Sequence, residues 1–328
     1  MNVRLLSAAD IITALPMAAA IEGVKNAYAQ LSAGQAVVPL RSHIEIPGAG
    51  SSLVMPAYLP EQGALTVKVV NVFPKNAEKR MPTIHALVFV VDNETGRPRA
   101  VLEGGALTAI RTGAASGAAT ELLARPDASS VLIIGSGVQA RTQLEAVCTV
   151  RDIREVEVFS LNRQEAEAFV ADLAGKRPIP TKIHIAENVN LAVSAADIIC
   201  TATTSFTPVF DGHFLKPGAH VNGIGSFTPQ MQEIDLVTVQ RSTLFVDARE
   251  AVWAEAGDFI IPLRNGDITE DYIAAELGEV VAGQHPGRSS DDQITFFKSV
   301  GVAVQDAAAA SITLKNALEQ NLGTIISL

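Results

Sequence analysis

Apolar residues in the middle of the chain alternate between strand-like and helix-like spacing. Val131, Leu132, Ile133 and Ile134 are four consecutive β-formers, which is typical of a strand buried on both faces of a parallel sheet. Apolar residues then recur at helical spacing directly after Gly137. The same alternation predicts further strands at 155–160, 182–185 and 197–202, separated by helices at 163–174 and near 188–195. This order is that of a Rossmann-type, doubly wound sheet of the α/β class.

The first third of the chain has a different pattern. An amphipathic helical region covers residues 8–33, and Gly34 is a typical helix stop. A helix crowded with small residues is predicted at 107–124, where Thr108 would cap it and place Arg111 in its first turn. Short strands are predicted between these helices at 52–59, 65–73, 85–91 and 99–102, the last two joined by a hairpin turn. These elements form an α+β module rather than a βαβ series.

The end of the chain is expected to pack against this first module. Residues 294–301 lead into an alanine-rich helix that runs to about Gln320. The predicted domains are therefore residues 1–124 together with about 303–328, and a Rossmann-type domain at 125–302.

Composition narrows the range of partners. The 25 basic and 35 acidic residues give a net charge of −10 without any basic cluster, so neither nucleic acid nor an anionic membrane surface is an expected partner. The two cysteines, Cys148 and Cys200, lie in apolar segments, which argues against a disulfide framework and against a metal site. Because no signal peptide or spanning segment is evident, a cytoplasmic location is expected.

A glycine turn joins the first predicted strand of the Rossmann-type domain to its helix. In the run Gly135-Ser136-Gly137-Val138-Gln139-Ala140, the first Gly permits the tight turn and the second lets a pyrophosphate approach the backbone. The small Ala140 allows close helix–strand packing, and the helix N-terminus offers free N–H groups to phosphates. We therefore predict that residues 135–139 bind a dinucleotide.

The end of the second predicted strand indicates which dinucleotide is bound. An NAD-preferring site places Asp or Glu there to bond the ribose 2′-hydroxyl. This chain has Asn162 and Arg163 instead, which favours the 2′-phosphate of NADP, although Asn162 also suits a helix cap. NADP(H) is therefore the predicted cofactor, with NAD(H) as the alternative.

Polar residues also follow two later strands of the same sheet. Thr201, Ala202 and Thr203 end one of these strands, and Gly225 and Ser226 follow the next. Ligands of open α/β sheets bind at the carboxyl ends of the strands, so both loops are candidate cofactor contacts. The alternative is that both are ordinary polar loops.

Three cations stand out in the first module. Lys68 interrupts the apolar run 65–70, and a lysine in such a run needs a partner or a cavity. Arg41 and Arg111 carry guanidinium groups, whose planar forks suit a carboxylate. Sequence spacing leaves open whether the three converge on one ligand or are separate surface residues.

These residues together resemble the ornithine cyclodeaminase/mu-crystallin family, and the likeness covers nearly the whole chain. The resemblance implies a homodimer in which the first modules pair. It also implies that Arg41, Lys68 and Arg111 surround a substrate carboxylate beside the nicotinamide ring, and that Thr112 and Lys298 contribute to the cofactor site. The matching pieces are Lys68-Val69-Val70-Asn71 with Pro74, Leu107-Thr108 with Arg111-Thr112, Gly135–Ala140, Val221-Asn222 with Gly225, and Lys298-Ser299-Val300-Gly301.

One position departs from the cyclodeaminase branch of that family. Cyclodeaminases carry an Asp two residues before the Pro of a Gly-x-Asp-x-Pro stretch, where this chain has Phe227 in Gly225-Ser226-Phe227-Thr228-Pro229. A phenyl ring cannot act as a base, but it suits the flat ring of a cyclic imine. The stretch is closer to that of the pyrroline-2-carboxylate reductase branch.

The resemblance therefore implies an enzyme that reduces cyclic ketimine carboxylates, either pyrroline- or piperideine-2-carboxylate, with NADPH as the hydride donor. Arg41 and Arg111 are expected to hold the carboxylate, Lys68 to act as the catalytic residue that bonds the carboxylate or the imine nitrogen, and Phe227 to line the substrate site. The alternatives are an ornithine cyclodeaminase, an alanine-dehydrogenase-like oxidoreductase, and a non-catalytic NADP-dependent binding protein.

Overall fold

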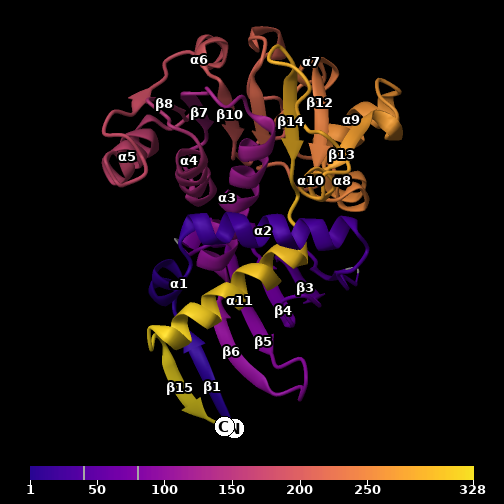
Figure 1. Cartoon of the computed structure of the whole chain (residues 1–328). Coiled ribbons are helices and arrows are strands. Elements are labelled where there is room, and N and C mark those ends of the chain that lie inside the picture. The colour runs from indigo at the N-terminus through magenta and orange to yellow at the C-terminus, as the bar shows by residue number, and fades with distance from the viewer. Residues whose placement is uncertain (40, 80) are drawn as a thin grey trace. The chain divides into compact units, whose positions relative to one another are not determined.

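The computed structural model describes residues 1–39, 41–79 and 81–328, which divide into two compact units (Figure 1). Unit 1 comprises Met1–Arg111 and Ala303–Leu328, and unit 2 comprises Thr112–Val302. The division falls inside helix α3 (Gly104–Leu123), earlier than the boundary predicted after residue 124, because this helix is continuous and contributes residues to both units.

Unit 1 is built on a seven-stranded sheet with the order β15-β1-β6-β5-β4-β3-β2. Strands β1 and β6 pair in parallel, and the other neighbours pair antiparallel. Helix α11 packs on α2 and on β3, β4 and β5, so it covers one face of this sheet. The strands are β1 (Asn2–Leu6), β2 (Ser42–Ile46), β3 (Gly50–Leu59), β4 (Ala64–Val72), β5 (Ile84–Val91), β6 (Pro98–Glu103) and β15 (Thr324–Ser327). The helices are α1 (Ala8–Ala14), α2 (Met17–Ser32), the 3-10 turn η1 (Pro74–Lys79) and α11 (Ala303–Glu319).

The helical region predicted at 8–33 consists of two helices rather than one. Helix α1 ends at Ala14, and Pro16 is the N-cap of α2. A proline lacks the backbone N–H that a continuous helix needs, whereas it is tolerated where a helix begins, so the break falls at this residue.

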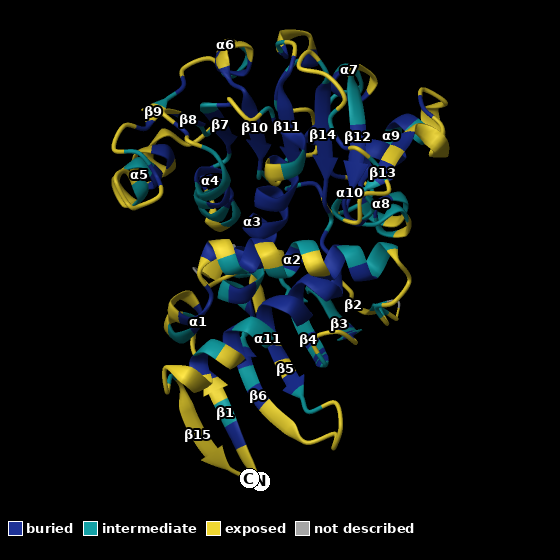
Figure 2. Cartoon of the chain, viewed as in Figure 1, coloured by how far each residue is buried: buried dark blue, intermediate teal, exposed yellow. Residues whose placement is uncertain are grey.

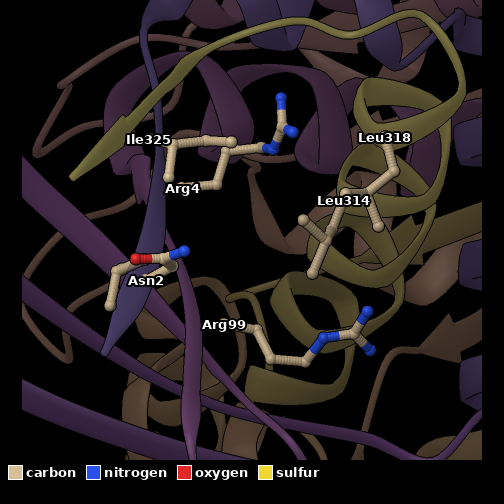
Figure 3. A pocket seen from close by; sticks show the side chains of 7 residues that line it. Asn2, Arg4, Arg99, Leu314, Leu318 and Ile325 are labelled. Atoms are coloured by element: carbon tan, nitrogen blue, oxygen red, sulfur yellow. The ribbon is translucent and has the colours of Figure 1, made fainter. Parts of the chain in front are cut away.

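A small open pocket lies at one end of unit 1 (Figure 3). It has a volume of about 160 Å³ and contains none of the predicted site residues. Arg4, one of its lining residues, donates a hydrogen bond to the carbonyl of Leu322. The pocket is lined by Asn2, Val3, Arg4, Arg99, Leu314, Leu318 and Ile325.

Unit 2 contains an eight-stranded, fully parallel sheet with the order β13-β12-β14-β11-β10-β7-β8-β9. The strand order reverses between β7 and β10, which is where doubly wound sheets bind ligands. The strands are β7 (Ser130–Ile134), β8 (Glu155–Phe159), β9 (His184–Ile185), β10 (Ile198–Thr201), β11 (His220–Gly223), β12 (Ser242–Val246), β13 (Ile273–Glu276) and β14 (Ile294–Lys298). The helices are α4 (Val138–Val150), α5 (Arg163–Leu173), α6 (Val189–Ala195), α7 (Leu236–Arg241), α8 (Arg249–Glu255), α9 (Gly257–Asn265) and α10 (Leu277–Val281), with 3-10 turns η2 (Gly212–Phe214) and η3 (Glu270–Tyr272).

The central strands of unit 2 are buried along their lengths (Figure 2). Apolar side chains lie on both faces of the sheet and form two clusters, one of which includes Leu132 and Ile134 and the other Val131 and Ile133. A strand covered on both faces needs a continuous apolar run, and this explains the pattern from which the sheet was predicted.

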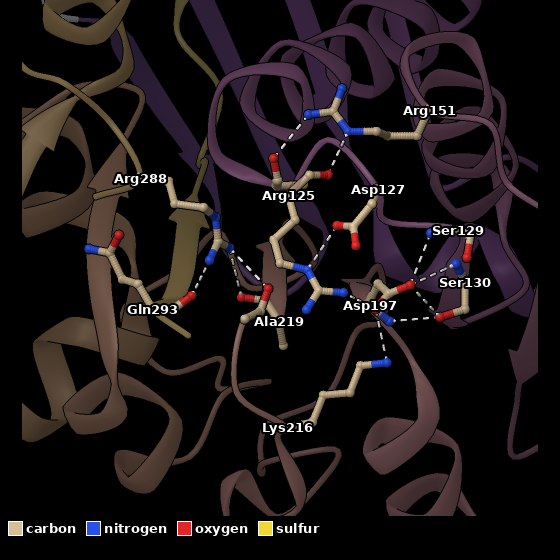
Figure 4. A network of polar contacts seen from close by, with 12 residues as sticks. Arg125, Asp127, Ser129, Ser130, Arg151, Asp197, Lys216, Ala219, Arg288 and Gln293 are labelled. Atoms are coloured by element: carbon tan, nitrogen blue, oxygen red, sulfur yellow. Dashed lines mark hydrogen bonds and ion pairs between the residues drawn. The ribbon is translucent and has the colours of Figure 1, made fainter. Parts of the chain in front are cut away.

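A polar network fixes the amino end of the same sheet (Figure 4). Asp197, which precedes β10, accepts hydrogen bonds from the backbone N–H groups of Ser129 and Ser130 at 2.9 and 3.1 Å, and it pairs with Arg125 and Lys216. Burial alone would raise the pKa of Asp197, but the Ser129 N–H and Lys216 outweigh it and lower the pKa to about 2. The carboxylate therefore ties the start of β7 to the start of β10, the two strands that flank the reversal.

Candidate active site and cofactor site

Lys68 lies on the covered face of β4 and is only 2 % exposed. It pairs across the sheet with Val88 and Met55, which are also buried, while its neighbours Val67 and Val69 face the other way. Its Nζ atom lies 3.1 Å from Oδ1 of Asp306, at the start of α11. The expectation that this lysine needs a partner is met by Asp306, which sequence reasoning did not single out.

Arg111 reaches the same carboxylate from helix α3. This helix begins at Gly104, and Glu103 caps it by accepting hydrogen bonds from its first N–H groups. The predicted cap at Thr108 is therefore wrong: its hydroxyl donates to the carbonyl of Gly104, one turn back. Arg111 consequently lies in the second turn of α3, where a first-turn dipole argument does not apply.

The cation–carboxylate cluster continues into a chain of hydrogen bonds. Arg111 donates through Nε to Oδ1 of Asp306 at 3.1 Å and through NH1 to Gln305 at 2.7 Å. The Gln305 amide in turn donates to the Tyr28 hydroxyl at 2.7 Å. All of these side chains are buried, and within the described residues Oδ2 of Asp306 has no hydrogen-bond partner.

Burial and neighbouring charges shift the pKa values of this cluster. Burial lowers the pKa of Lys68 to about 8; Asp306 opposes the shift, whereas Arg111 and Arg41 add to it. Burial would raise the pKa of Asp306, but Arg111 and Lys68 outweigh it and hold the pKa below its ordinary value. The cluster thus keeps a carboxylate ionised beside a lysine that can gain or lose a proton near neutral pH.

Arg41 belongs to the same electrostatic neighbourhood. It precedes β2, is partly buried, and its charge acts on the pKa of Lys68. All three cations predicted for the substrate site are therefore in unit 1, and both arginines act electrostatically on Lys68. Phe227 belongs to unit 2, where it lies 41 % exposed in the loop after β11.

The glycine turn of unit 2 has the geometry of a ligand cradle. Gly135 has φ +113°, and a Cβ atom there would lie 2.5 Å from the carbonyl oxygen of Ala202, so only Gly fits where the loops after β7 and β10 meet. A Cβ atom on Gly137 would meet nothing within 4 Å. Gly137 is also the N-cap of α4 and provides no side-chain cap, so the first N–H groups of this helix are available to phosphates. These features fit a dinucleotide.

Glu233 organises both polar loops at the carboxyl end of the sheet. It accepts hydrogen bonds from the Thr203 N–H at 2.6 Å, the Thr201 hydroxyl at 3.0 Å, and the N–H groups of Gly225 and Ser226 at 2.6 and 3.0 Å. Burial raises its pKa. Sequence reasoning missed Glu233, because it follows the loops it holds without any motif of its own.

Lys298 supports this arrangement from inside the unit. Its ammonium group is fully buried and lies 2.8 Å from Oδ2 of Asp258. Asp258 in turn accepts hydrogen bonds from the backbone N–H groups of Glu233 and Ile234. Thr112 is likewise buried, and its carbonyl accepts a hydrogen bond from Gln143. In contrast, Val138, at the start of α4, is exposed, and Gln139 beside it is half-buried.

The residues after β8 include a helix cap and an exposed arginine. Asn162 caps α5 by accepting hydrogen bonds from the N–H groups of Gln164 and Glu165, which confirms the capping alternative. Arg163 is exposed and pairs with Glu167 at 3.1 Å and Glu187 at 2.7 Å.

The parallel sheet, the glycine turn and the buried lysine–carboxylate cluster define a dinucleotide-dependent enzyme of Rossmann type. The ornithine cyclodeaminase/mu-crystallin family matches residues 1–321, and the chain belongs to this family.

Three relatives show how far the similarity extends. A Delta(1)-pyrroline-2-carboxylate reductase of Bacillus cereus is 39 % identical over 308 residues, which cover 93 % of this chain and 94 % of the relative. The solved structure of a Thermococcus litoralis Delta(1)-pyrroline-2-carboxylate reductase with NADH and L-proline is 43 % identical, with a TM-score of 0.93 over 98 % of this chain and 99 % of that one. An archaeal alanine dehydrogenase dimer with bound NAD is 34 % identical, with a TM-score of 0.92 over the whole of both chains.

Proposed function

We propose that this protein is an NAD(P)H-dependent reductase that converts a cyclic ketimine carboxylate, such as Delta(1)-pyrroline-2-carboxylate, into the cyclic amino acid. The observation that carries the proposal is the buried cluster of Lys68, Arg111 and Asp306, with Arg41 nearby. It combines cations for a carboxylate with a lysine whose pKa of about 8 suits proton transfer. The relatives that act on pyrroline-2-carboxylate, at 39 and 43 % identity, support the same substrate class.

Arg111 and Arg41 bind the substrate carboxylate in this proposal. A guanidinium group has five N–H donors, and Arg111 uses Nε and one of its terminal nitrogens for Asp306 and Gln305. Those bonds fix the plane of the guanidinium group and leave other donors for a ligand. The hydrogen bond from Gln305 to Tyr28 in turn restrains the Gln305 side chain.

Lys68 holds a proton for the imine nitrogen. A protonated imine is a better hydride acceptor than a neutral one, and the lysine ammonium group can share or supply that proton. Asp306 favours the charged form of Lys68, so it keeps the proton available despite the burial of the lysine. Asp306 is thus a positioning residue, because it acts through Lys68 and Arg111.

The dinucleotide is proposed to bind along the carboxyl edge of the unit 2 sheet, where it supplies the hydride. The backbone of 135–139 accommodates the pyrophosphate, and the loops held by Glu233 contact the rest of the cofactor. NADPH is the proposed preference, supported by the exposed Arg163 and by the absence of a carboxylate among Phe159, Ser160 and Leu161 at the end of β8. We also propose a cytoplasmic location, where the reduced cofactor is regenerated.

A homodimer is proposed on the basis of the uncovered face of the unit 1 sheet. Phe89 and Leu87 of β5 are 36 and 46 % exposed, and they lie beside Val67 and Val69 of β4 on this face. The row continues to Val101 of β6. A second copy would bury this apolar surface, and the related alanine dehydrogenase is a dimer.

No helix among the described residues combines the length and apolarity needed to cross a bilayer.

The deciding experiment is a comparison of substrates. Purified protein should oxidise NADPH with pyrroline-2-carboxylate or piperideine-2-carboxylate and form the cyclic amino acid without releasing ammonia. Oxidation with pyruvate plus ammonia but with neither imine would instead indicate an alanine dehydrogenase. Ammonia release from ornithine would indicate a cyclodeaminase, which the proposal disfavours because Phe227 provides no base.

A further inference from the structure

The carboxylate of Glu165 lies against the glycine turn of unit 2. Glu165 is in the first turn of α5, and its Oε2 lies 3.2 Å from the hydroxyl of Ser136, the middle residue of Gly135-Ser136-Gly137. Ser136 is also 3.0 Å from the hydroxyl of Ser160, which directly follows β8. Three segments therefore meet here: the turn after β7, the end of β8 and the start of α5.

This is the location where dinucleotide-binding sheets recognise the adenosine ribose. Their acidic residue stands at the end of the second strand and accepts a hydrogen bond from the ribose 2′-hydroxyl. In this chain the strand ends at Phe159 and is followed by Ser160 and Leu161, so no acid occupies that position in the sequence. The structure instead brings in a carboxylate from the next helix, 29 residues after Ser136.

Glu165 differs from the other acids around it. Glu167 and Glu187 are both paired with Arg163. Glu165 accepts a hydrogen bond from the Asn162 side chain at 3.2 Å, but it forms no ion pair with any cation in the part of the chain that the structure describes. Its negative charge is thus not neutralised by a salt bridge, and it is an exposed residue that a ligand can reach.

We propose that Glu165 discriminates between the two nicotinamide cofactors: its carboxylate accepts a hydrogen bond from the ribose 2′-hydroxyl of NADH and repels the 2′-phosphate of NADPH. Arg163 attracts that phosphate, so the two residues act in opposite directions and Glu165 limits the preference for NADPH. The proposal rests on the proposed nicotinamide cofactor but is independent of the imine substrate.

The test is Glu165→Gln, which keeps the size and an acceptor oxygen but removes the charge. A hydrogen bond to a charged group contributes roughly 1.5–3 kcal/mol, so the Kd ratio of NADH to NADPH should shift by about tenfold to a hundredfold toward NADPH. Fluorescence titration of each reduced cofactor gives these Kd values without turnover. Calorimetry with ADP-ribose and 2′-phospho-ADP-ribose, which differ only in the 2′-phosphate, measures the effect of this contact on binding without the nicotinamide ring.

A matched control is Glu155→Gln, because Glu155 begins the same strand at its opposite end and is also exposed. This variant loses the same charge and should leave the ratio unchanged. If Glu165 only holds the turn in place, Glu165→Gln will weaken both cofactors equally, and that result overturns the proposal. Wild-type protein that binds both cofactors but reduces neither imine would refute the proposed reductase function while leaving the role of Glu165 to be decided by the same Kd ratio.

Discussion

The ammonium group of Lys68 lies 3.1 Å from the carboxylate of Asp306, and the two residues are 238 positions apart in the chain. Both side chains are almost completely buried, at 2 and 1 % exposure. Burying one charge without the other would be strongly unfavourable, whereas the pair retains an ionised lysine inside the unit. The proposed chemistry depends on this retained proton.

Replacement of Lys68 by Met should lower activity without unfolding the protein. Met keeps much of the volume of the lysine stem, and Asp306 remains paired with Arg111, so no carboxylate is left isolated. Loss of a charge-assisted bond to substrate costs roughly 1.5–3 kcal/mol, or about tenfold to a hundredfold in kcat/KM. Kinetics and a melting curve measure the two effects. Lys315→Met, which alters an exposed lysine of α11, should change neither, and a folded Lys68→Met of normal efficiency would remove Lys68 from the site.

The pH dependence of imine reduction should reflect Lys68. Its pKa of about 8 means that kcat/KM falls as the pH rises through this value, because the deprotonated lysine has no proton to share. Asp306→Asn removes the charge that raises this pKa, so the basic limb should move roughly 1–3 pH units lower. The substrate has the same pKa in the wild-type and Asp306→Asn experiments, so a difference between the two basic limbs comes from the enzyme. Coincident basic limbs, with circular dichroism showing a folded variant, would contradict the role assigned to Asp306.

Arg163→Ala should weaken binding of NADPH but have little effect on binding of NADH. The expected loss for NADPH is about tenfold or more, since a hydrogen bond between charged groups contributes roughly 1.5–3 kcal/mol. Fluorescence titration with each cofactor provides the comparison. Arg154→Ala is a suitable control, because Arg154 is also exposed and pairs with a nearby acid, Asp152. Unchanged NADPH affinity in Arg163→Ala would argue against a preference based on this residue.

Phe89→Glu should dissociate the proposed homodimer. The substitution places a charge in the apolar row formed with Val67 and Val101, and burial of that charge in an interface is costly. Analytical ultracentrifugation should show a monomer for this variant and a dimer for the wild type. Ile12→Glu, at an exposed position of α1, should leave the dimer intact. A dimeric Phe89→Glu variant would place the interface elsewhere.

Stability should decrease as the pH falls below about 6.5, partly because of His220. Burial, with the charge of Arg288 as a smaller cause, lowers its pKa from 6.5 to about 3. Between these values the unfolded chain binds a proton that the folded chain does not, so acid favours unfolding. At pH 5 the lowered pKa of His220 reduces the free energy of unfolding by about 2 kcal/mol. The difference between the urea midpoints at pH 7 and pH 5 should therefore be smaller in His220→Gln than in wild type. The control His213→Gln, at an exposed position, should keep the wild-type difference. Equal pH sensitivity of His220→Gln and wild type would show that His220 titrates normally.

The local parts of the architecture could be predicted from sequence because each has a short-range cause. Residues 131–134 form a strand because they are a continuous apolar run, and Gly135 forms the turn because glycine readily adopts its positive φ. The same is true of α5, whose start at Arg163 follows from the Asn162 cap. The start of helix α3 is predicted less accurately. Thr108 is a residue type that caps helices, but Glu103 provides the cap in the structure.

The partners within the candidate site could not be predicted in this way. Lys68 attracts notice because it is charged within an apolar strand, but nothing near it in sequence identifies Asp306. Asp306 carries a comparable signal, as the one acid in an alanine-rich helical start, although acids are common in first helical turns for electrostatic reasons. Glu233 gives no such signal, because its role depends on the meeting of two loops that only the folded sheet brings together.

Because unit 1 is discontinuous in sequence, its two segments can pack together only after both have been synthesised. Residues Thr112–Val302 form one continuous stretch and can fold as soon as they emerge, whereas Met1–Arg111 must wait for Ala303–Leu328. Until then Lys68 has no Asp306 beside it, and β4 lacks the helix that covers it. The lysine–carboxylate pair of the candidate site therefore forms only after Ala303–Leu328 has been synthesised, later than every residue of unit 2.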